Sequence, residues 1–589
     1  MKKGVLSVSI GSVLYYLNIR QKRWALLISL MLFFSSLLDV FGLASIIPII
    51  KIASKPEIVT TNKYLSVVYS GLGFSSIRNF LLFLIISVFI FFILKNLFIL
   101  LVNYIQQKFI ANVTVKIIDM QYAKYYQLPF WHFNNLGSSK ILNHVNTTPD
   151  LYCSFLLQPL FVLFSEFMII SFIVIGVAIY QPILFLILAV ILGPTTYLIY
   201  SSLESKSREL GERMDDLRPK TFSLLHDSYM GFVDLKLSEK QKIFQKRYLS
   251  VVKEYADLKA IVQLLKAIPT KIIETIAILG IVLIFIYSLF INNHTENILT
   301  LLGLFVAAAY RLMPSINRIL NSLMSLKGHQ FTLENLKIYR DTHQHLDESI
   351  QQKNINFNNS IVFDNISYSF PDGKDLILKD ISLEVSRGEK IGFIGSSGAG
   401  KTTLMNILLR FYKENSGSIM VDGIPLVDDN LKAWRKLLGY VRQDVFIMEG
   451  NVLENITLGE KNVDYDRLYR SIEQASLKDY IDKLPQGLST LVGEQGSKLS
   501  GGQKQRMGIA RALYKKAEIL VFDEATSALD NETEREVTEA IKKLSDTDIT
   551  LFIVAHRITT LKDCDRIYEI KNGRLVGQHQ YKDIFKSIM

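Results

Sequence analysis

A glycine-rich segment in the second half of the chain has the residue types and spacing needed to bind phosphate. It reads Gly395-Ser-Ser-Gly-Ala-Gly-Lys-Thr, follows the apolar run KIGFI and precedes a helix-compatible stretch. Glycines let successive backbone N–H groups turn toward an anion, while the lysine adds a charge and the hydroxyl offers a magnesium ligand. The predicted phosphate site comprises Gly395, Ser396, Ser397, Gly398, Ala399, Gly400, Lys401, Thr402 and Thr403.

A second segment, Leu499–Gln503, places a hydroxyl and two glycines directly before the helix-compatible run KQRMGIARAL. The first turn of a helix has N–H groups without intrahelical partners, and the helix dipole makes that end attractive to an anion. We therefore predict that this segment also contacts phosphate, through Ser500, Gly501, Gly502 and Gln503.

These two segments and their order resemble the ATP-binding-cassette family, in which the second segment of one subunit closes over the γ-phosphate held by the other. The resemblance implies ATP and Mg²⁺ as ligands, ATP hydrolysis as the reaction and two cassettes as the working unit. Since the residues that match the family's catalytic pattern are intact in this one cassette, we expect a homodimer with two competent sites.

The same resemblance assigns roles to residues at further positions. In ILVFDE, Asp523 resembles the magnesium-supporting carboxylate and Glu524 the general base for water. Gln443 in YVRQD resembles the glutamine that senses magnesium, His556 in IVAHR resembles the switch histidine, and residues 527–530 resemble the loop that crosses the dimer interface. The implied catalytic residues are Lys401, Gln443, Glu524 and His556, and the implied magnesium ligands are Thr402, Gln443 and Asp523.

One position departs from the family pattern. An adenine-stacking tyrosine is expected before the proline of ISYSFPDG, but Phe370 stands there, with Tyr368 two residues earlier. Because stacking needs only the face of the ring, we expect Phe370 to bind the base.

The N-terminal part of the chain has the composition of a membrane domain. Hydrophobic residues make up 49% of the 589 residues, and their excess lies in runs before residue 325. Six runs approach spanning length and are predicted to be transmembrane helices: Trp24–Ile50, Asn79–Val102, Phe155–Tyr180, Ile183–Tyr200, Ile268–Ile291 and Ile298–Leu323. The net charge of +11 comes largely from loops between these runs, which fits membrane topology better than nucleic-acid binding.

The charge of the loops predicts the orientation of the spans. Basic residues crowd the loop between the fourth and fifth spans, whereas Asn292–Asn297 contains no lysine or arginine. Basic loops remain on the cytoplasmic side, so both termini and the cassette should be cytoplasmic. The two long inner loops should continue the helices into the cytoplasm, and their aromatic tips, Leu128–Gly137 and Asp227–Leu235, should dock on a partner domain.

The predicted architecture is therefore a six-helix, all-α transmembrane domain of the exporter type followed by an α/β P-loop domain. The expected boundaries are residues 1–340 for the transmembrane domain, 341–355 for a linker and 356–589 for the ATP-binding domain.

Charged residues inside the predicted spans suggest a polar path across the membrane. Such charges are costly in hydrocarbon and face either a partner or a cavity. Asp39 can pair with an arginine of another span, which would make these charges structural. Alternatively, Lys95, Arg311 and Arg318 line a cationic cavity suited to an anionic headgroup such as pyrophosphate.

The segment AAYRLMPSINRILNS and the amphipathic stretch Tyr64–Gly73 resemble the lipid-linked oligosaccharide flippases of bacterial protein N-glycosylation. This resemblance runs through both domains. It implies a polyprenyl-pyrophosphate-linked oligosaccharide as cargo, carried from the inner to the outer leaflet of the bacterial inner membrane. It also implies membrane lipid and the lipid-linked glycan as partners.

Other functions are compatible with the same scaffold. An exporter of another lipid, a drug or a peptide would use the intramembrane charges only to pair helices. A siderophore importer also shares the exporter fold, while an ATP-gated channel is disfavoured by Glu524, because a channel does not need a general base.

Overall fold

The computed structural model describes residues 5–45, 48–49, 52–53, 56–180, 182–291, 295–338, 353–371, 373, 375–525, 531–545, 547–555 and 557–588. The chain forms two compact units: Met1–Leu128 with Asn135–His343, and Pro129–Asn134 with Gln344–Met589. We call them the helical unit and the ATP-site unit. Most of the predicted linker, residues 341–352, lies outside the described residues.

The helical unit contains the elements expected of a transmembrane domain. Its long helices are α2 (Ile19–Ala44), α6 (Ile77–Tyr126), α10 (Gln158–Tyr180), α11 (Pro182–Met230), α13 (Gln241–Ile291) and α14 (Thr295–Gly328). Its shorter elements are α1 (Val5–Tyr16), α4 (Ile58–Thr61), α5 (Lys63–Gly71), α8 (Ser138–Leu142), η1 (Asn143–Thr147), α9 (Thr148–Tyr152), η2 (Cys153–Leu157), α12 (Phe232–Leu237) and α15 (Phe331–Lys337).

Three stretches of the described residues are long and apolar enough to cross a membrane: Ile19–Gly42, Ile77–Tyr126 and Ser138–Ile179. The other three predicted spans fall on α11, α13 and α14, which contain residues whose side chains are not described. Helices α6, α11 and α13 have 50, 49 and 51 residues. At a rise of 1.5 Å per residue each is about 75 Å long, more than twice the hydrocarbon thickness, so each extends well outside the bilayer.

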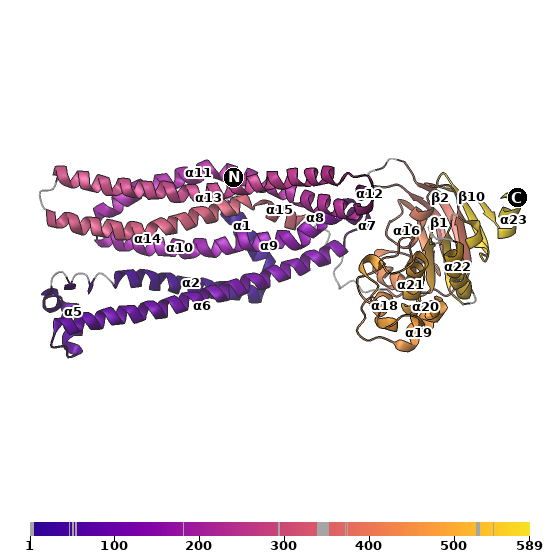
Figure 1. The fold of residues 1–589 in the computed structure, drawn as a ribbon, viewed down its shortest axis with the longest axis horizontal. Helices are drawn as coiled ribbons and strands as arrows, with labels where there is room; N and C mark the ends of the chain where they lie inside the picture. Colours follow the sequence, from indigo (N-terminus) through magenta and orange to yellow (C-terminus); the bar gives the residue numbers. More distant parts are fainter. Residues whose placement is uncertain are drawn as a thin grey trace. The chain divides into compact units, whose positions relative to one another are not determined.

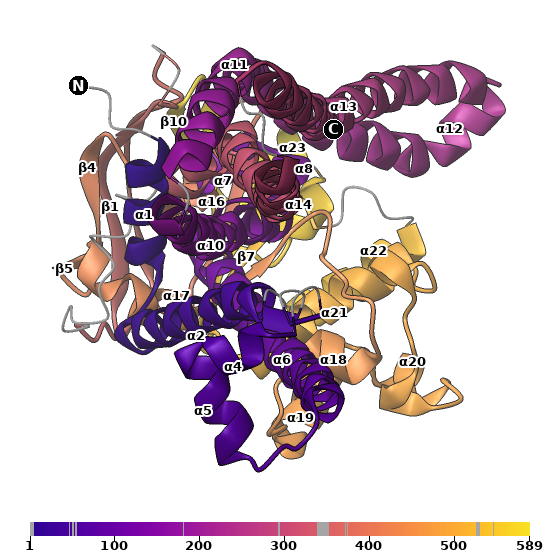
Figure 2. The ribbon, with the colours of Figure 1, turned by 90° about the vertical axis from the view of Figure 1, so that its left-hand side faces the viewer.

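The long helices pack side by side (Figures 1 and 2). Helix α2 contacts α6 and α10, and α14 contacts α10, α11 and α13. Figure 2 shows α12 at the end of the hairpin formed by α11 and α13, away from the other helices of this unit. The charged positions of α14 therefore lie within reach of α2 and α10.

The ATP-site unit contains two sheets. The first sheet is antiparallel, in the order β2 (Leu378–Ser386), β1 (Ser360–Tyr368), β4 (Ser416–Val421) and β5 (Ile424–Pro425). The second has the order β10 (Arg574–His579), β9 (Arg566–Lys571), β3 (Lys390–Ile394), β8 (Thr550–Val554), β7 (Ile519–Asp523) and β6 (Leu438–Val441). Strands β9, β3, β8, β7 and β6 pair in parallel, whereas β10 pairs antiparallel to β9.

Helices accompany the second sheet and complete this unit. They are α7 (Phe130–Leu136, of which residues 130–134 belong here), α16 (Lys401–Leu408), α17 (Leu431–Leu437), α18 (Val452–Thr457), α19 (Tyr465–Gln474), α20 (Lys478–Asp482), α21 (Gly501–Tyr514), α22 (Asn531–Ser545) and α23 (Tyr581–Ile588). Strands β7 and β8 are buried at every position. Because parallel strands buried on both faces are typical of an α/β fold, the predicted all-α and α/β fold classes are both confirmed.

Candidate ATP-binding site

The predicted phosphate loop connects β3 to α16, and its glycines adopt conformations that other residues avoid. Gly395 has φ +150° and Gly400 has φ +107°. A Cβ atom on Gly395 would lie 2.2 Å from the carbonyl oxygen of Ile570, and one on Gly400 would lie 2.7 Å from Leu378 Cδ2. The loop therefore needs glycine for its backbone conformation and for its close packing.

The Lys401 side chain lies along this loop. Its ammonium group donates hydrogen bonds to the carbonyl oxygens of Gly395 at 2.8 Å and Ser396 at 3.0 Å, and the residue is 4% exposed. Burial lowers the pKa of Lys401, although the charges of Glu524 and Asp523 act in the opposite direction. The ammonium is thus held beside the N-terminus of α16, an arrangement of a cation and a helix N-terminus that suits a phosphate group.

Thr402 and Asp523 form the pair expected at a magnesium site. Thr402 Oγ1 donates to Asp523 Oδ1 at 3.1 Å, and the phenol of Tyr440 donates to Asp523 Oδ2 at 3.0 Å. Burial raises the pKa of Asp523, while these two hydrogen bonds lower it. A hydroxyl beside a carboxylate is a ligand set that suits Mg²⁺. Mg²⁺ held there would neutralise phosphate charge.

Tyr440 was not among the residues predicted for the site. It lies on β6 beside β7, in the register Tyr440↔Val521 and Val441↔Phe522. The sequence YVRQD places Tyr440 three residues before Gln443 but does not reveal this pairing. Gln443 itself is exposed and accepts a bond from Gln505 Nε2 through its backbone oxygen. Within the part of the chain that the structure describes, no hydrogen bond joins the Gln443 side chain to Thr402 or Asp523.

Glu524 follows β7 directly and has an unusual backbone conformation. Its φ is +54°, and its N–H donates to the carbonyl oxygen of Val554 at 3.0 Å. Left-handed conformations of residues other than glycine are uncommon and often mark functional sites. The predicted partners His556 and residues 527–530 lie outside the described residues.

Ser500 forms the N-terminal cap of α21. Its hydroxyl accepts from the Gln503 N–H at 3.2 Å, and Gln503 Oε1 accepts from the Ser500 N–H at 2.9 Å. This capping box fixes the start of a 14-residue helix with Ser500 and Gly501 exposed. Among the described residues, no hydrogen bond joins Leu499–Gln503 to the phosphate loop of the same chain.

Phe370 lies in an aromatic cluster. Trp131 stacks on it with ring centroids 5.0 Å apart, and the edges of Tyr368 and Tyr412 approach it at 5.5 and 5.7 Å. Phe130 stacks on Phe411 at 4.9 Å. The tip residues Pro129–Asn134 thus lie on the ATP-site unit, as their aromatic composition predicts.

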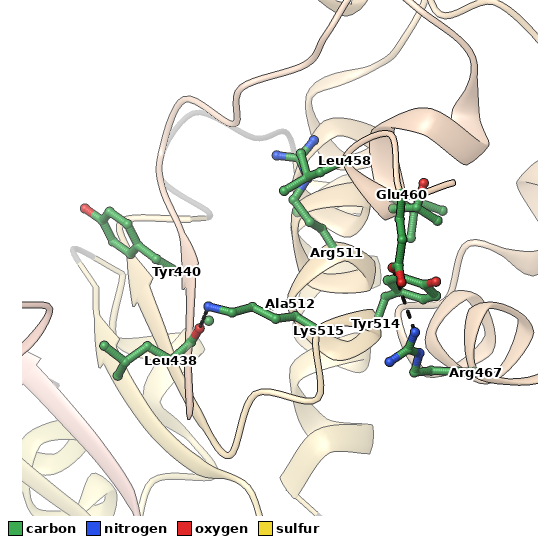
Figure 3. Close-up of a pocket in the computed structure, with 13 residues that line it drawn as sticks. Leu438, Tyr440, Leu458, Glu460, Arg467, Arg511, Ala512, Tyr514 and Lys515 are labelled. Atoms are coloured by element: carbon green, nitrogen blue, oxygen red, sulfur yellow. Dashed lines mark hydrogen bonds and ion pairs between the residues drawn. The ribbon is translucent and has the colours of Figure 1, made fainter. Parts of the chain in front are cut away.

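A separate cleft of ≈ 450 Å³ lies among β6, α18, α19 and α21 (Figure 3). Its lining includes Leu458, Arg467, Arg511 and Lys515. Lys515 donates to the carbonyl oxygen of Leu438 at 2.7 Å, and burial lowers the pKa of Arg511. Leu458 is 56% exposed and has φ +52°, so an apolar side chain is presented beside basic ones.

In the helical unit, one carboxylate is shared by two of the predicted cationic residues. Asp39 on α2 accepts from Lys95 Nζ at 2.8 Å and is also paired with Arg311 of α14. The internal pairing of Asp39 with an arginine is therefore confirmed. Two cations share one carboxylate, so the cluster has a formal charge of +1.

Arg318 has its own partner, Glu166 on α10, at 2.6 Å. Glu166 is buried in the third predicted span and was not among the charged residues predicted there. The expected cationic excess of three residues is therefore reduced, because the Arg318 pair is formally neutral. Lys95 and Arg311 account for the remaining charge.

The phosphate loop, the Thr402–Asp523 pair and the capped α21, joined to long membrane helices, define a membrane protein with an ATP-binding-cassette unit. Residues 26–314 match the ABC transporter transmembrane region and residues 378–527 match the ABC transporter family model. The chain therefore belongs to the ABC transporters, as an exporter-type half-transporter with one transmembrane region and one ATPase domain. It is a multi-pass membrane protein.

Known proteins support this assignment. A solved structure described as a bacterial Atm1-family ABC exporter with ATP bound has a TM-score of 0.78 and 23% identity, and the match covers 97% of this chain and 96% of that one. An ATP-dependent lipid A-core flippase of Ralstonia nicotianae is 42% identical over 38% of each chain. The ABC transporter ATP-binding protein YwjA of Bacillus subtilis is 39% identical over 42% of this chain and 43% of its own. The matches thus span about two fifths of these relatives' lengths.

Proposed function

We propose that two copies of this chain form an ATP-driven translocase that moves a lipid with an anionic headgroup from the inner to the outer leaflet of the bacterial inner membrane. The observation that carries this proposal is the Lys95–Asp39–Arg311 cluster, which leaves a formal positive charge inside the transmembrane region. Charge inside a membrane is costly, and where it is not neutralised by a partner it commonly lines a substrate path. Relatives named lipid A-core flippases support a lipid cargo.

Within this class, we propose a polyprenyl-pyrophosphate-linked oligosaccharide as the cargo. A pyrophosphate carries charge that Lys95 and Arg311 can bind, and Arg318 can contribute when Glu166 is displaced. A sugar chain and a pyrophosphate cannot cross hydrocarbon without a polar path, because neither can be desolvated there at tolerable cost. Ion pairs that separate when the cargo binds would expose Lys95, Arg311 and Arg318 and so supply such a path.

The chemistry follows from the ATP-site unit. Glu524 would take the proton from the attacking water, Lys401 would hold the terminal phosphates, and Thr402 with Asp523 would hold Mg²⁺. Ser500 and Gly501, at the N-terminus of α21, are exposed and therefore accessible to another molecule. We therefore propose that the second copy supplies this segment to each site.

The second aromatic tip, Asp227–Leu235, and the cleft of Figure 3 are a candidate contact between the two copies of the dimer. Tyr229, Met230 and Phe232 are 72%, 59% and 61% exposed. We propose that this tip of one copy docks in the other copy's cleft beside Leu458. Met230→Cys with Leu458→Cys should then cross-link two copies, whereas Leu249→Cys, an exposed residue of α13, with Leu458→Cys should not.

The deciding experiment is ATP-dependent translocation of a labelled polyprenyl-pyrophosphate oligosaccharide in proteoliposomes, with a phospholipid and a hydrophobic drug offered as competing cargos. Lys95→Met should reduce translocation at least fivefold but basal ATP hydrolysis less than twofold, because it removes the net charge and leaves the Asp39–Arg311 pair intact. Lys271→Met, at an exposed pair with Glu274, is the matched control. Equal transport of the drug, or full activity of Lys95→Met, would favour the alternative of a general lipid, drug or peptide exporter.

A further inference from the structure

The helical unit contains an apolar cavity away from the charged residues. Its volume is ≈ 550 Å³, within the range of ligand pockets, and it lies among α10, α11 and α14. The α14 residues that line it are buried or half-buried, whereas the α11 residues that line it are half-buried or exposed. Its lining includes Val177, Gly193, Tyr197, Tyr200, Leu312 and Leu323.

The cavity occupies a different face of α14 from the cationic cluster. Its α14 residues, Leu312, Ile316, Leu320 and Leu323, follow the helical spacing of one stripe. Arg311 is rotated by about 100° from Leu312, since a helix turns once in 3.6 residues. Arg311 and Arg318 instead contact Asp39 and Glu166. The cavity is thus a second feature and not part of the proposed cargo path.

The length of the cavity and the polarity of its two ends match one leaflet of a bilayer. Leu312 and Leu323 are 11 residues apart, which corresponds to about 16 Å along the helix, close to half of the ~30 Å hydrocarbon thickness. One end, near Val177 and Leu312, is apolar. The other end has Tyr197 and Tyr200, and tyrosines gather at the level of lipid headgroups.

Charged residues follow the tyrosine end of the cavity. Glu204 lies four residues after Tyr200 on α11 and forms an ion pair with Lys327. Lys327 lies four residues after Leu323, on the same stripe of α14. On the orientation predicted from the loops, this is the cytoplasmic end. An amphipathic molecule would therefore place its apolar part toward Leu312 and its polar part toward Tyr200.

We propose that this cavity holds one acyl chain of a phospholipid from the inner leaflet, with the headgroup at Tyr197 and Tyr200. A cavity lined by apolar side chains does not hold water, and an empty one forfeits contacts on its whole lining. The medium around a transmembrane helix is hydrocarbon, and the cavity opens past the exposed Gly193 and Tyr197 of α11. An acyl chain can enter there.

Glycine substitutions give a matched test. A Cβ atom on Gly193 or on Gly176 would meet nothing within 4 Å, but only Gly193 lines the cavity. Gly193→Phe should fill the cavity, and Gly176→Phe on α10 should not. Gly193→Ala adds almost no volume and reports any backbone cost at the position before Pro194.

The probes are two phosphatidylglycerols that carry a photoreactive diazirine, one at the acyl terminus and one near the glycerol. In proteoliposomes of the full chain, the first should label peptides around Val177 and Leu312, and the second should label peptides around Tyr200 and Leu323. Gly193→Phe should reduce this labelling at least fivefold, whereas Gly193→Ala and Gly176→Phe should change it less than twofold.

Three outcomes would overturn the proposal. Equal labelling of the Gly193→Phe and Gly176→Phe proteins would show that the label comes only from lipid around the protein. Labelling that does not follow the depth of the diazirine would exclude an acyl chain held in one orientation in the cavity. Loss of self-association by Gly193→Phe alone, measured by light scattering, would show that a helix of a second copy fills the cavity. Because lipid labelling needs no ATP, its failure is distinguishable from a failure of transport.

Discussion

The indole ring of Trp131 stacks on the phenyl ring of Phe370, with centroids 5.0 Å apart and ring planes 22° apart. Trp131 belongs to the short segment Pro129–Asn134, which connects parts of the helical unit but lies on the ATP-site unit. The residue proposed to bind adenine is therefore also a contact of the connecting tip. Because the Phe370 ring would take part in both interactions, binding of adenine and the position of the segment Pro129–Asn134 should affect each other.

Removing the Phe370 ring should weaken ATP binding. A base stacked on an aromatic ring gains about 1–3 kcal/mol, so Phe370→Ala should raise the Kd of ATP by roughly 5- to 150-fold. Phe370→Tyr should stay within about twofold, because it keeps the stacking face. Equilibrium binding of ATP and GTP by the purified variants measures both effects. A Phe370→Ala protein that binds ATP as tightly as the parent would contradict the assignment.

Replacing Trp131 tests whether its indole orients Phe370 for the adenine base or occupies the ring face that the base needs. If Trp131 orients Phe370, Trp131→Ala should weaken ATP binding by a smaller factor than Phe370→Ala, about threefold, since stacked pairs contribute about 0.5–1.5 kcal/mol. His132→Ala, in the same segment, is the control. Tighter ATP binding by Trp131→Ala would show instead that the indole occupies the face that adenine needs.

Glu524→Gln should abolish steady-state hydrolysis while ATP binding persists. General-base catalysis contributes about 10²–10⁴-fold, and the amide keeps the size of the side chain but cannot accept the proton. Glu473→Gln, an exposed position on α19, should hydrolyse ATP at the parental rate. Phosphate release assays on both purified proteins decide the matter, and substantial turnover by Glu524→Gln would assign the base elsewhere.

Local sequence patterns predict the parts of this site that one segment provides. The phosphate loop, the cap at Ser500 and the apolar runs each depend on neighbours in sequence. The structure places the loop and the cap at the start of a helix, as expected, and shows spanning length for three of the six runs. The sequence predicted that Asp39 pairs with an arginine, but it did not predict which arginine or the other contacts between distant segments. Asp39 meets Lys95 and Arg311 across 56 and 272 residues, and Tyr440 meets Asp523 across 83 residues. Those pairs depend on helix packing and strand register, which spacing alone does not determine.

The buried histidine His329 should make stability depend on pH. Its ring stacks on Phe155 at 4.1 Å, and burial lowers its pKa from 6.5 to about 4. Between these values the unfolded chain binds the proton and the folded chain does not, so stability is full above pH 6.5 and falls toward pH 4. At pH 5 the loss amounts to at most about 2 kcal/mol. His329→Phe should show a smaller fall in apparent Tm between pH 7 and pH 5; an unchanged fall would place its cause in other groups.

Removing the carboxylate of the Asp39 cluster should reduce stability more than removing one of its two cations. Asp39→Asn leaves Lys95 and Arg311 together without a carboxylate, and breaking a buried ion pair in this way costs about 3–5 kcal/mol. Lys95→Met keeps one neutral pair and should cost much less. The apparent Tm of the detergent-purified proteins should therefore fall most for Asp39→Asn. Equal effects of the two substitutions would mean that the pairs do not stabilise the fold.

Mixed dimers test whether each ATP site is built from two chains. Lys401→Ala removes the cation from the phosphate loop, and Ser500→Arg blocks the N-terminus of α21 with a bulky side chain in place of the capping hydroxyl. If the sites are composite, a dimer of one Lys401→Ala copy and one Ser500→Arg copy retains one intact site, made from the loop of the second copy and the capped helix of the first. A dimer of a parental copy and a double-mutant copy then retains none.

Sites built within one chain would give the opposite result, because the parental copy would keep its own loop and its own helix together. Differently tagged copies, purified through both tags, allow ATP hydrolysis to be measured for each mixed dimer. We expect about half of the parental rate from the first mixture and background from the second. Hydrolysis by the second mixture alone would refute the composite site and place each ATP site within one chain.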